Sequence, residues 1–150
     1  MIFAGRECQK IIFISTDKAY LPTCAYGASK MLAEFIVLEH PCGIVWRFGN
    51  FIGSRGSVFE IFKEQEAQGV PLTITDPEAT RFVIKIDKVC DYVLSDVKPG
   101  LHYPKDLKSM TILEIADMVA PGSKHVIIGD RGEQEKKHEA FNEHYTSEKK

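Results

Sequence analysis

The sequence predicts an α/β fold in which most neighbouring strands are parallel. Two short, nearly continuous apolar runs, KIIFI at residues 10–14 and GIVWRF at residues 43–48, are typical of strands buried on both faces. Between them, residues 25–40 carry apolar side chains at helical spacing. Strand-like and helix-like segments continue to alternate along the chain, which is the pattern of a sheet covered by helices.

The first third of the chain contains the two buried strands, the helix between them and two loops. Residues 15–24 include Pro22 and several polar side chains, so we expect a loop there. The helix over residues 25–40 ends at the Pro-Cys-Gly sequence of residues 41–43, and the second strand follows at once. The sequence GNFIGSRG at residues 49–56 predicts a second loop because of its glycines.

The rest of the chain continues the alternation. Ser57 with Glu60, and Thr111 with Glu114, have the spacing of a capping box and each predict the start of a helix. From residue 131 onward the chain is polar and charged, so we expect a tail that is solvated or docked against a partner. The predicted elements are a helix at 57–68, a strand at 72–75, a half-buried strand at 82–86, a helix at 87–97, a strand at 101–103, a helix at 111–120 and a strand at 124–128.

Composition excludes several classes of protein. The 150 residues are 44% hydrophobic and 27% charged, which is typical of a folded domain. The net charge of −2 argues against a nucleic-acid-binding protein, and no apolar run is long enough to span a membrane. The chain shows no secretory signal, and none of its four cysteines lies at zinc-site spacing from another, so we expect reduced thiols, a cytoplasmic location and no metal site.

Tyr26 and Lys30 form the first candidate pair for chemistry. Four residues apart on the predicted helix, they lie on one face, one turn apart. A lysine ammonium beside a phenol lowers the phenol pKa from about 10 and makes tyrosine usable as an acid or base. By itself the Tyr-x-x-x-Lys spacing also fits two ordinary exposed helix residues.

The loop after the first strand carries a second group of reactive side chains. Ser15, Thr16, Asp17 and Lys18 follow one another where the strand ends, and α/β folds place ligand sites at that edge of the sheet. An elimination needs a base to take a proton from carbon and an acid to protonate the departing hydroxyl, and Asp17 and Lys18 would provide such a pair. A solvated surface turn is the alternative interpretation.

Three ordered blocks of this sequence resemble the extended short-chain dehydrogenase/reductases. STDKAYLPTCAYGASK, RFGNFIGSRGSV and PLTITDPEATRF are most similar to the inverting UDP-N-acetylglucosamine 4,6-dehydratases of polysaccharide biosynthesis, from about residue 4 to about residue 139. The resemblance implies a Rossmann-like fold without its first four strands, together with a small substrate-binding lobe. It divides the chain into residues 1–56 with the catalytic segment, the lobe at 57–130 and the charged tail at 131–150, all in one compact unit.

The resemblance also implies catalytic roles. Tyr26 and Lys30 would contact the nicotinamide ribose of NADP or NAD, with Tyr26 as the redox acid/base. Thr16, Asp17 and Lys18 would carry out the elimination, and the sequence does not divide the acid and base roles between Asp17 and Lys18. In this family the C4 hydroxyl of a UDP-sugar is oxidised, water is lost across C5 and C6, and C6 is reduced with inversion at C5.

Candidate substrate-binding residues follow from the same resemblance and from their positions. Arg47 and Asn50 lie at the carboxyl end of the second strand, and Ser57 precedes a helix amino terminus, which is a natural anion site. Arg55 and Arg81 are candidates for diphosphate contacts, whereas Arg47 and Arg81 would alternatively hold loops through structural ion pairs. Arg131 matches a phosphate-contacting arginine of the family, but the proline of that segment is missing and a residue is inserted before His138. We expect His138 and His144 to be solvated.

The glycine-rich loop that binds the cofactor pyrophosphate is missing from this sequence. No two glycines lie two residues apart, so G-x-G-x-x-G does not occur. We therefore expect a dehydratase that needs a separate cofactor-binding half, and we expect the first strand to be covered by another chain, by rearranged elements or in a homo-oligomer. A non-catalytic nucleotide-sugar-binding or oligomerising remnant of such an enzyme is the alternative.

Overall fold

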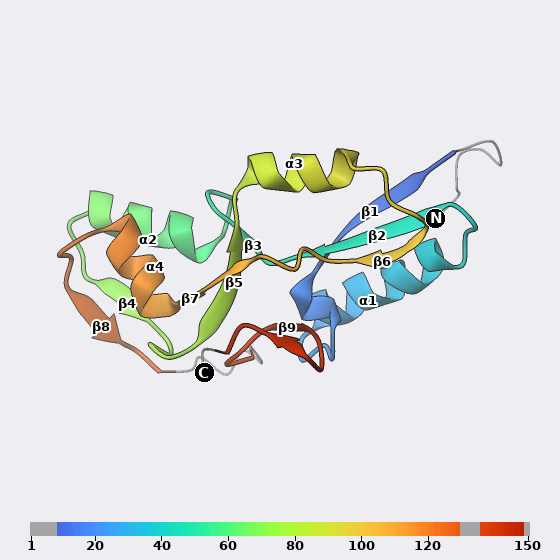
Figure 1. The fold of residues 1–150 in the computed structure, drawn as a ribbon. Helices are drawn as coiled ribbons and strands as arrows, with labels where there is room; N and C mark the ends of the chain where they lie inside the picture. The colour runs from blue at the N-terminus through green and yellow to red at the C-terminus, as the bar shows by residue number, and fades with distance from the viewer. Residues whose placement is uncertain (1–8, 130–135, 149–150) are drawn as a thin grey trace.

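The computed structural model of the protein describes residues 9–129 and 136–148, and it confirms the α/β prediction (Figure 1). Strands β1 (Ile11–Thr16), β2 (Gly43–Phe48) and β6 (Gly100–His102) form a parallel sheet in the order β1-β2-β6. Thr16 pairs with Phe48, so β1 and β2 end at the same edge of this sheet. That edge is where the candidate catalytic loop leaves β1.

Helices cover the two faces of this sheet. Figure 1 shows α1 (Ala25–Leu38) on one side and α3 (Ile86–Leu94) on the other. All six residues of β2 are buried, as predicted, and Trp46 packs against Tyr92 of α3 with 5.3 Å between ring centroids. The prediction that β1 is buried on both faces is wrong at its start, where Ile12 is 39% exposed. Among the described residues β1 has a partner strand on one side only, which leaves its outer edge open.

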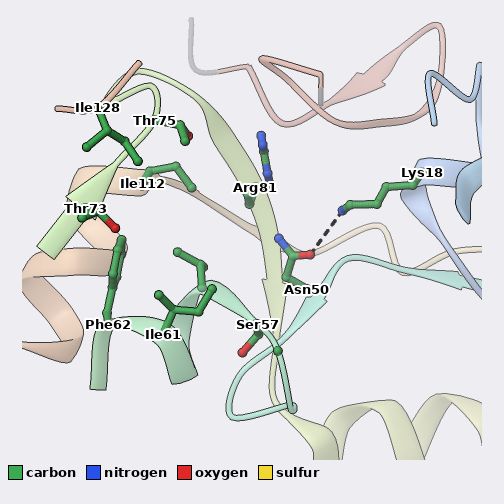
Figure 2. A pocket seen from close by; sticks show the side chains of 12 residues that line it. Lys18, Asn50, Ser57, Ile61, Phe62, Thr73, Thr75, Arg81, Ile112 and Ile128 are labelled. Atoms are coloured by element: carbon green, nitrogen blue, oxygen red, sulfur yellow. Dashed lines mark hydrogen bonds between the residues drawn. The ribbon is translucent and has the colours of Figure 1, made fainter. Parts of the chain in front are cut away.

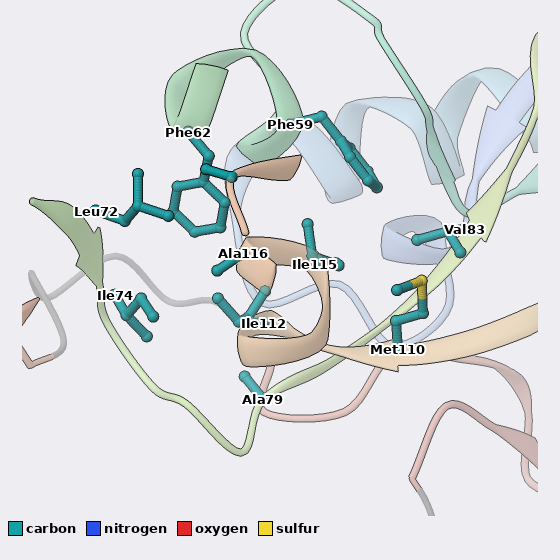
Figure 3. Packing of buried hydrophobic residues seen from close by; sticks show 11 residues of the cluster. Phe59, Phe62, Leu72, Ile74, Ala79, Val83, Met110, Ile112, Ile115 and Ala116 are labelled. Carbon is teal, nitrogen blue, oxygen red and sulfur yellow. The ribbon is translucent and has the colours of Figure 1, made fainter. Parts of the chain in front are cut away.

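A second set of elements forms a lobe beside the sheet. Strand β5 (Thr80–Ile84) pairs in parallel with β3 (Asn50–Phe51) and antiparallel with β7 (Lys108–Thr111). Strand β4 (Leu72–Ile74) pairs with β8 (His125–Ile127). Helices α2 (Val58–Ala67) and α4 (Ile112–Val119) close the lobe over an apolar core that Figure 3 shows from close by; its members include Phe59, Phe62, Leu72, Ile74, Val83, Met110 and Ile115. None of the helices among the described residues has the length and apolar character that a membrane span requires.

Both predicted helix starts are confirmed, with Ser57 and Thr111 at the N-cap positions, but only Thr111 forms a capping box. Thr111 accepts a hydrogen bond from the Glu114 amide (3.1 Å), and the Glu114 carboxylate accepts one from the Thr111 amide (2.7 Å), which completes the capping box of α4. Ser57 instead donates its hydroxyl to the carbonyl of Ser54 (2.6 Å) and makes no side-chain cap to α2. The Ser57 amide donates to the same carbonyl (3.2 Å), which closes a turn immediately before α2.

The prediction of a solvated or partner-docked tail is wrong for residues 136–148. They fold back onto the chain and form a hairpin of β9 (Ala140–Asn142) and β10 (Tyr145–Thr146). Phe141 is buried because its ring packs on Phe82, with 4.9 Å between centroids, and stacks on Tyr103 at 5.4 Å. The hairpin covers one face of β5 and the lobe core covers the other, so β5 is buried at all five positions and not half-buried.

Candidate active site

The predicted catalytic loop forms a short 3-10 helix, η1 (Asp17–Ala19), immediately after β1. Thr16 caps it by accepting a hydrogen bond from the Lys18 amide (3.3 Å). Gly27 of α1 permits the close packing of this loop, because a Cβ at that position would lie 2.3 Å from the Lys18 carbonyl oxygen. The glycine one residue after Tyr26 therefore sets how closely α1 approaches the loop.

A buried cluster of charged groups surrounds Lys18. Asp17 is fully buried, and its Oδ1 accepts hydrogen bonds from the Thr16 hydroxyl (2.9 Å) and from Lys18 Nζ (3.4 Å). Lys18 Nζ also lies 3.3 Å from Oε1 of Glu139, which the C-terminal segment contributes and which is 1% exposed. Glu139 was not among the residues predicted for the site. Its position after His138 in the segment that resembles the family is the only sequence signal that pointed to it.

The charges in this cluster shift one another's proton affinities. Burial lowers the pKa of Lys18, but Asp17 and Glu139 together outweigh burial, so the pKa lies above its ordinary value of 10.5. Burial, and then repulsion from Asp17, raise the pKa of Glu139 above 4.5. Burial also lowers the pKa of Lys136, whose Nζ lies 3.9 Å from Glu139 Oε2. The cluster thus holds one firmly protonated amine and one carboxyl group that retains its proton to a higher pH than usual.

Tyr26 and Lys30 lie on one face of α1, in the arrangement that their spacing implies. Lys30 Nζ is 5.9 Å from the centre of the Tyr26 ring and 4.9 Å from that of Phe13. It donates a hydrogen bond to the carbonyl of Ile14 (3.2 Å), which ties α1 to β1. Tyr26 is 54% exposed, so its phenol is accessible to a bound molecule.

A cavity of about 360 Å³ opens between the catalytic loop and the lobe. Lys18 and Asn50 lie at one end, with Lys18 Nζ donating to Asn50 Oδ1 at 3.4 Å, and Figure 2 shows this contact together with Arg81 on the neighbouring strand β5. Gly56, Ser57 and Val58, at the amino terminus of α2, form another part of the wall. Further lining side chains are Ile61, Phe62, Thr73, Thr75, Ile112 and Ile128. The cavity therefore has cationic, hydroxyl and apolar surfaces within reach of Lys18.

Arg47 does not line this cavity. It forms a structural ion pair, which is the alternative to its predicted role in substrate binding. Its Nε and Nη2 donate to the two carboxylate oxygens of Glu34 at 2.9 and 2.6 Å, and Nη1 donates to the carbonyl of Phe141 at 3.2 Å. The Ser15 hydroxyl donates a hydrogen bond to the same carboxylate. Arg47 thus joins β2, α1 and the C-terminal hairpin.

The other predicted substrate-binding residues differ in where they lie. Arg81 lines the cavity and also donates to the carbonyls of Lys136 (3.0 Å) and Lys137 (3.2 Å), so it holds the C-terminal segment next to the cavity. Arg55 is exposed and does not line the cavity. Arg131 lies outside the described residues.

The two histidines of the C-terminal segment also differ. The solvated placement expected for His138 is wrong, because His138 Nδ1 forms a 2.7 Å hydrogen bond with the Thr80 hydroxyl. His144 is exposed, as expected. Within residues 9–129 and 136–148, no group of three or more His, Cys, Asp or Glu side chains is arranged to hold a metal ion.

Comparison with known proteins identifies the family. A family model described as "Polysaccharide biosynthesis protein" matches residues 3–149. An inverting UDP-N-acetylglucosamine 4,6-dehydratase from Campylobacter jejuni (strain 81-176) is 39% identical over 143 residues, which are 87% of this chain and 42% of the relative. The chain thus spans less than half the length of that enzyme.

Solved structures agree in fold. The X-ray structure of Pen from Bacillus thuringiensis matches with a TM-score of 0.80 and 25% identity, over 91% of this chain and 48% of that protein. A dTDP-glucose 4,6-dehydratase from Bacillus anthracis, solved in complex with NAD, matches with a TM-score of 0.71 and 16% identity, over 83% of this chain and 51% of that protein. The chain belongs to the polysaccharide biosynthesis protein family and has the fold of the extended short-chain dehydrogenase/reductases.

Proposed function

We propose that this chain carries the acid–base and sugar-nucleotide-binding part of an NAD(P)-dependent UDP-N-acetylglucosamine 4,6-dehydratase. The observation that carries the proposal is the Asp17–Lys18 pair at the carboxyl edge of a parallel sheet, with Lys18 lining a cavity of about 360 Å³. Sugar-nucleotide chemistry of this kind is supported by the 39% identity to the Campylobacter dehydratase. These residues span 42% of that enzyme, so we expect activity only when the cofactor-binding part is also present.

The cavity suits a UDP-sugar with the sugar near Lys18. Arg81 provides positive charge for the diphosphate, and the amino terminus of α2, which has no side-chain cap, lines the same cavity. Thr73 and Thr75 offer hydroxyls, and Phe62 and Ile112 an apolar surface, for the nucleoside. Asn50, 3.4 Å from Lys18 Nζ, is placed to accept or donate a hydrogen bond at the sugar.

The chemistry of each residue follows from its contacts. Hydride removal from C4 and its return to C6 is what a nicotinamide cofactor supplies when bound. Tyr26 is exposed with Lys30 beside it, which fits the nicotinamide-ribose end of that cofactor. Oxidation at C4 acidifies the C5 hydrogen, so one member of the Asp17–Lys18 pair would take that proton while the other protonates the departing C6 hydroxyl. Thr16 would hydrogen-bond the C4 oxygen.

The pyrophosphate of the cofactor needs residues that this sequence does not contain. The 150 residues hold no G-x-G-x-x-G, so we infer that a cofactor-binding part outside them completes the site. The open edge of β1 is a natural place for that part to add strands.

Binding and turnover test the proposal separately. Calorimetry of the chain with UDP and UDP-N-acetylglucosamine should show binding, and Arg81→Lys should weaken it while Arg55→Lys serves as the matched control. Mixing the chain with UDP-N-acetylglucosamine, NADP and the amino-terminal half of the Campylobacter relative should give a 4-keto-6-deoxy product. No heat at millimolar ligand would exclude the site, and an epimerised sugar in place of the 4-keto product would exclude the dehydration.

An oligomerising role is the second candidate, and the outer surface of α1 favours it. Leu32 and Phe35 are each 60% exposed, and Ile36 is 43% exposed on the same helix. A second copy of this chain would bury that apolar surface. Light scattering that shows a monodisperse monomer would count against this role.

A further inference from the structure

We propose that Glu139 is a positioning residue of the acid–base site, holding the Lys18 ammonium opposite Asp17 at the end of the cavity. The role in dehydration rests on the proposed function, whereas the contact between Glu139 and Lys18 does not. The residue comes from the C-terminal segment, far along the chain from Lys18, and it is absent from the set of catalytic residues that the sequence predicted.

The backbone of Glu139 is fixed by hydrogen bonds at both of its polar groups. Its amide donates to the Ser147 hydroxyl (2.8 Å), and its carbonyl accepts from the Ser147 amide (2.7 Å). Ser147 is itself buried and bonds through its hydroxyl to the Thr80 hydroxyl (2.8 Å) and carbonyl (3.1 Å). Glu139 is therefore anchored to β5, the same strand that carries Arg81.

The side chain of Glu139 has the geometry of a partner for Lys18. Oε1 lies 3.3 Å from Lys18 Nζ, close to the 3.4 Å that separates Nζ from Asp17 Oδ1. Among the described residues, Glu139 Oε2 and Asp17 Oδ2 are buried and have no hydrogen-bond partner. Both buried carboxylates thus contact the Lys18 ammonium, with Lys136 Nζ at 3.9 Å from Glu139 Oε2, and each keeps an oxygen that accepts no hydrogen bond, which a purely structural ion pair does not require.

The charges around Lys18 come from three parts of the fold. Asp17 lies next to it in η1, Arg81 faces it from β5, and Lys136 and Glu139 face it from the C-terminal segment. The two carboxylates stabilise the ammonium, Arg81 opposes it, and Lys136 and Lys18 repel each other. Removing the charge of Glu139 leaves Asp17 as the single carboxylate contact of Lys18 in this group, so the ammonium should become easier to deprotonate.

The test is an NMR titration of the full chain, with lysine labelled with ¹³C at Cε and the Lys18 signal assigned from Lys18→Met. We expect a pKa above 10.5 in the wild type, because two carboxylates face the ammonium. Glu139→Gln should lower it by about one unit or more. Glu78→Gln is the matched control: Glu78 pairs with Lys137 at 2.6 Å on the surface, so this variant should change the Lys137 signal and leave that of Lys18 in place.

Two results would overturn the proposal. One is an unchanged Lys18 pKa in a folded Glu139→Gln variant. The other is a wild-type pKa at or below 10.5, which decides the question even if the variant does not fold. The titration needs neither substrate nor cofactor. A lower Lys18 pKa in Glu139→Gln, combined with no turnover by the completed enzyme, would therefore refute the proposed function and leave the Glu139–Lys18 contact supported. In the completed enzyme, Glu139→Gln should alter kcat and its pH dependence while changing KM for the UDP-sugar less. Glu139→Asp should recover part of kcat.

Discussion

Replacing Arg47 with methionine leaves the Glu34 carboxylate buried without its guanidinium partner. The pair is bidentate, at 2.9 and 2.6 Å, and the two side chains are 10% and 4% exposed. Removing one partner of a buried pair costs about 3–5 kcal/mol, because the remaining charge stays out of water. The Arg47 bond to the Phe141 carbonyl is lost as well, which loosens the hairpin that brings Glu139 to Lys18.

Urea unfolding followed by circular dichroism measures this loss. With a slope of about 2 kcal/mol per molar urea, the midpoint should fall by about 1.5–2.5 M. Lys88→Met is the control, because the Lys88–Asp91 pair is 70% exposed at both side chains and is worth about 0–1 kcal/mol. The double variant Arg47→Met, Glu34→Met should be more stable than Arg47→Met alone, since it removes the uncompensated charge. A loss below about 1 kcal/mol for Arg47→Met would refute the assignment of a structural ion pair.

Three further predictions follow from the contacts. Thr111→Ala should cost about 1 kcal/mol of unfolding free energy because it removes a formed capping box, and Ser57→Ala should cost less; an equal loss in urea unfolding would contradict this. The pKa of Lys18 is raised on folding, so its contribution to stability is present below pH 10.5 and is lost as the pH rises through the folded-state value. As the pH is raised above 10.5, Lys18→Met should therefore lose less unfolding free energy than the wild type. Equal losses in the two proteins would contradict the pairing. The hydrogen bond to Asp106 raises the pKa of Tyr92 from 10.0 to about 12, so the phenolate absorbance of Tyr92 should develop near pH 12, and Asp106→Asn should lower that pH; an unchanged titration of that variant would refute the bond as the cause.

Much of the secondary structure was predictable because it depends on local patterns. The strand at residues 43–48 was placed with its observed bounds, since a continuous apolar run has one stable environment, the middle of a covered sheet. The burial of β5 was not predictable in the same way. Its residues are covered on one face by the lobe core and on the other by Phe141, which lies far along the chain in a segment of polar composition.

The sequence by itself determined the α/β fold, the shared helix face of Tyr26 and Lys30, and the position of Asp17 and Lys18 where a strand ends. These features depend on residue spacing, which the 3.6-residue period of the helix and the edge of a parallel sheet convert directly into geometry. Only the tertiary structure decided that Arg47 pairs with Glu34 and that Glu139 contacts Lys18. Both contacts join segments that periodicity does not relate, and they form because buried charges must find partners when the chain packs.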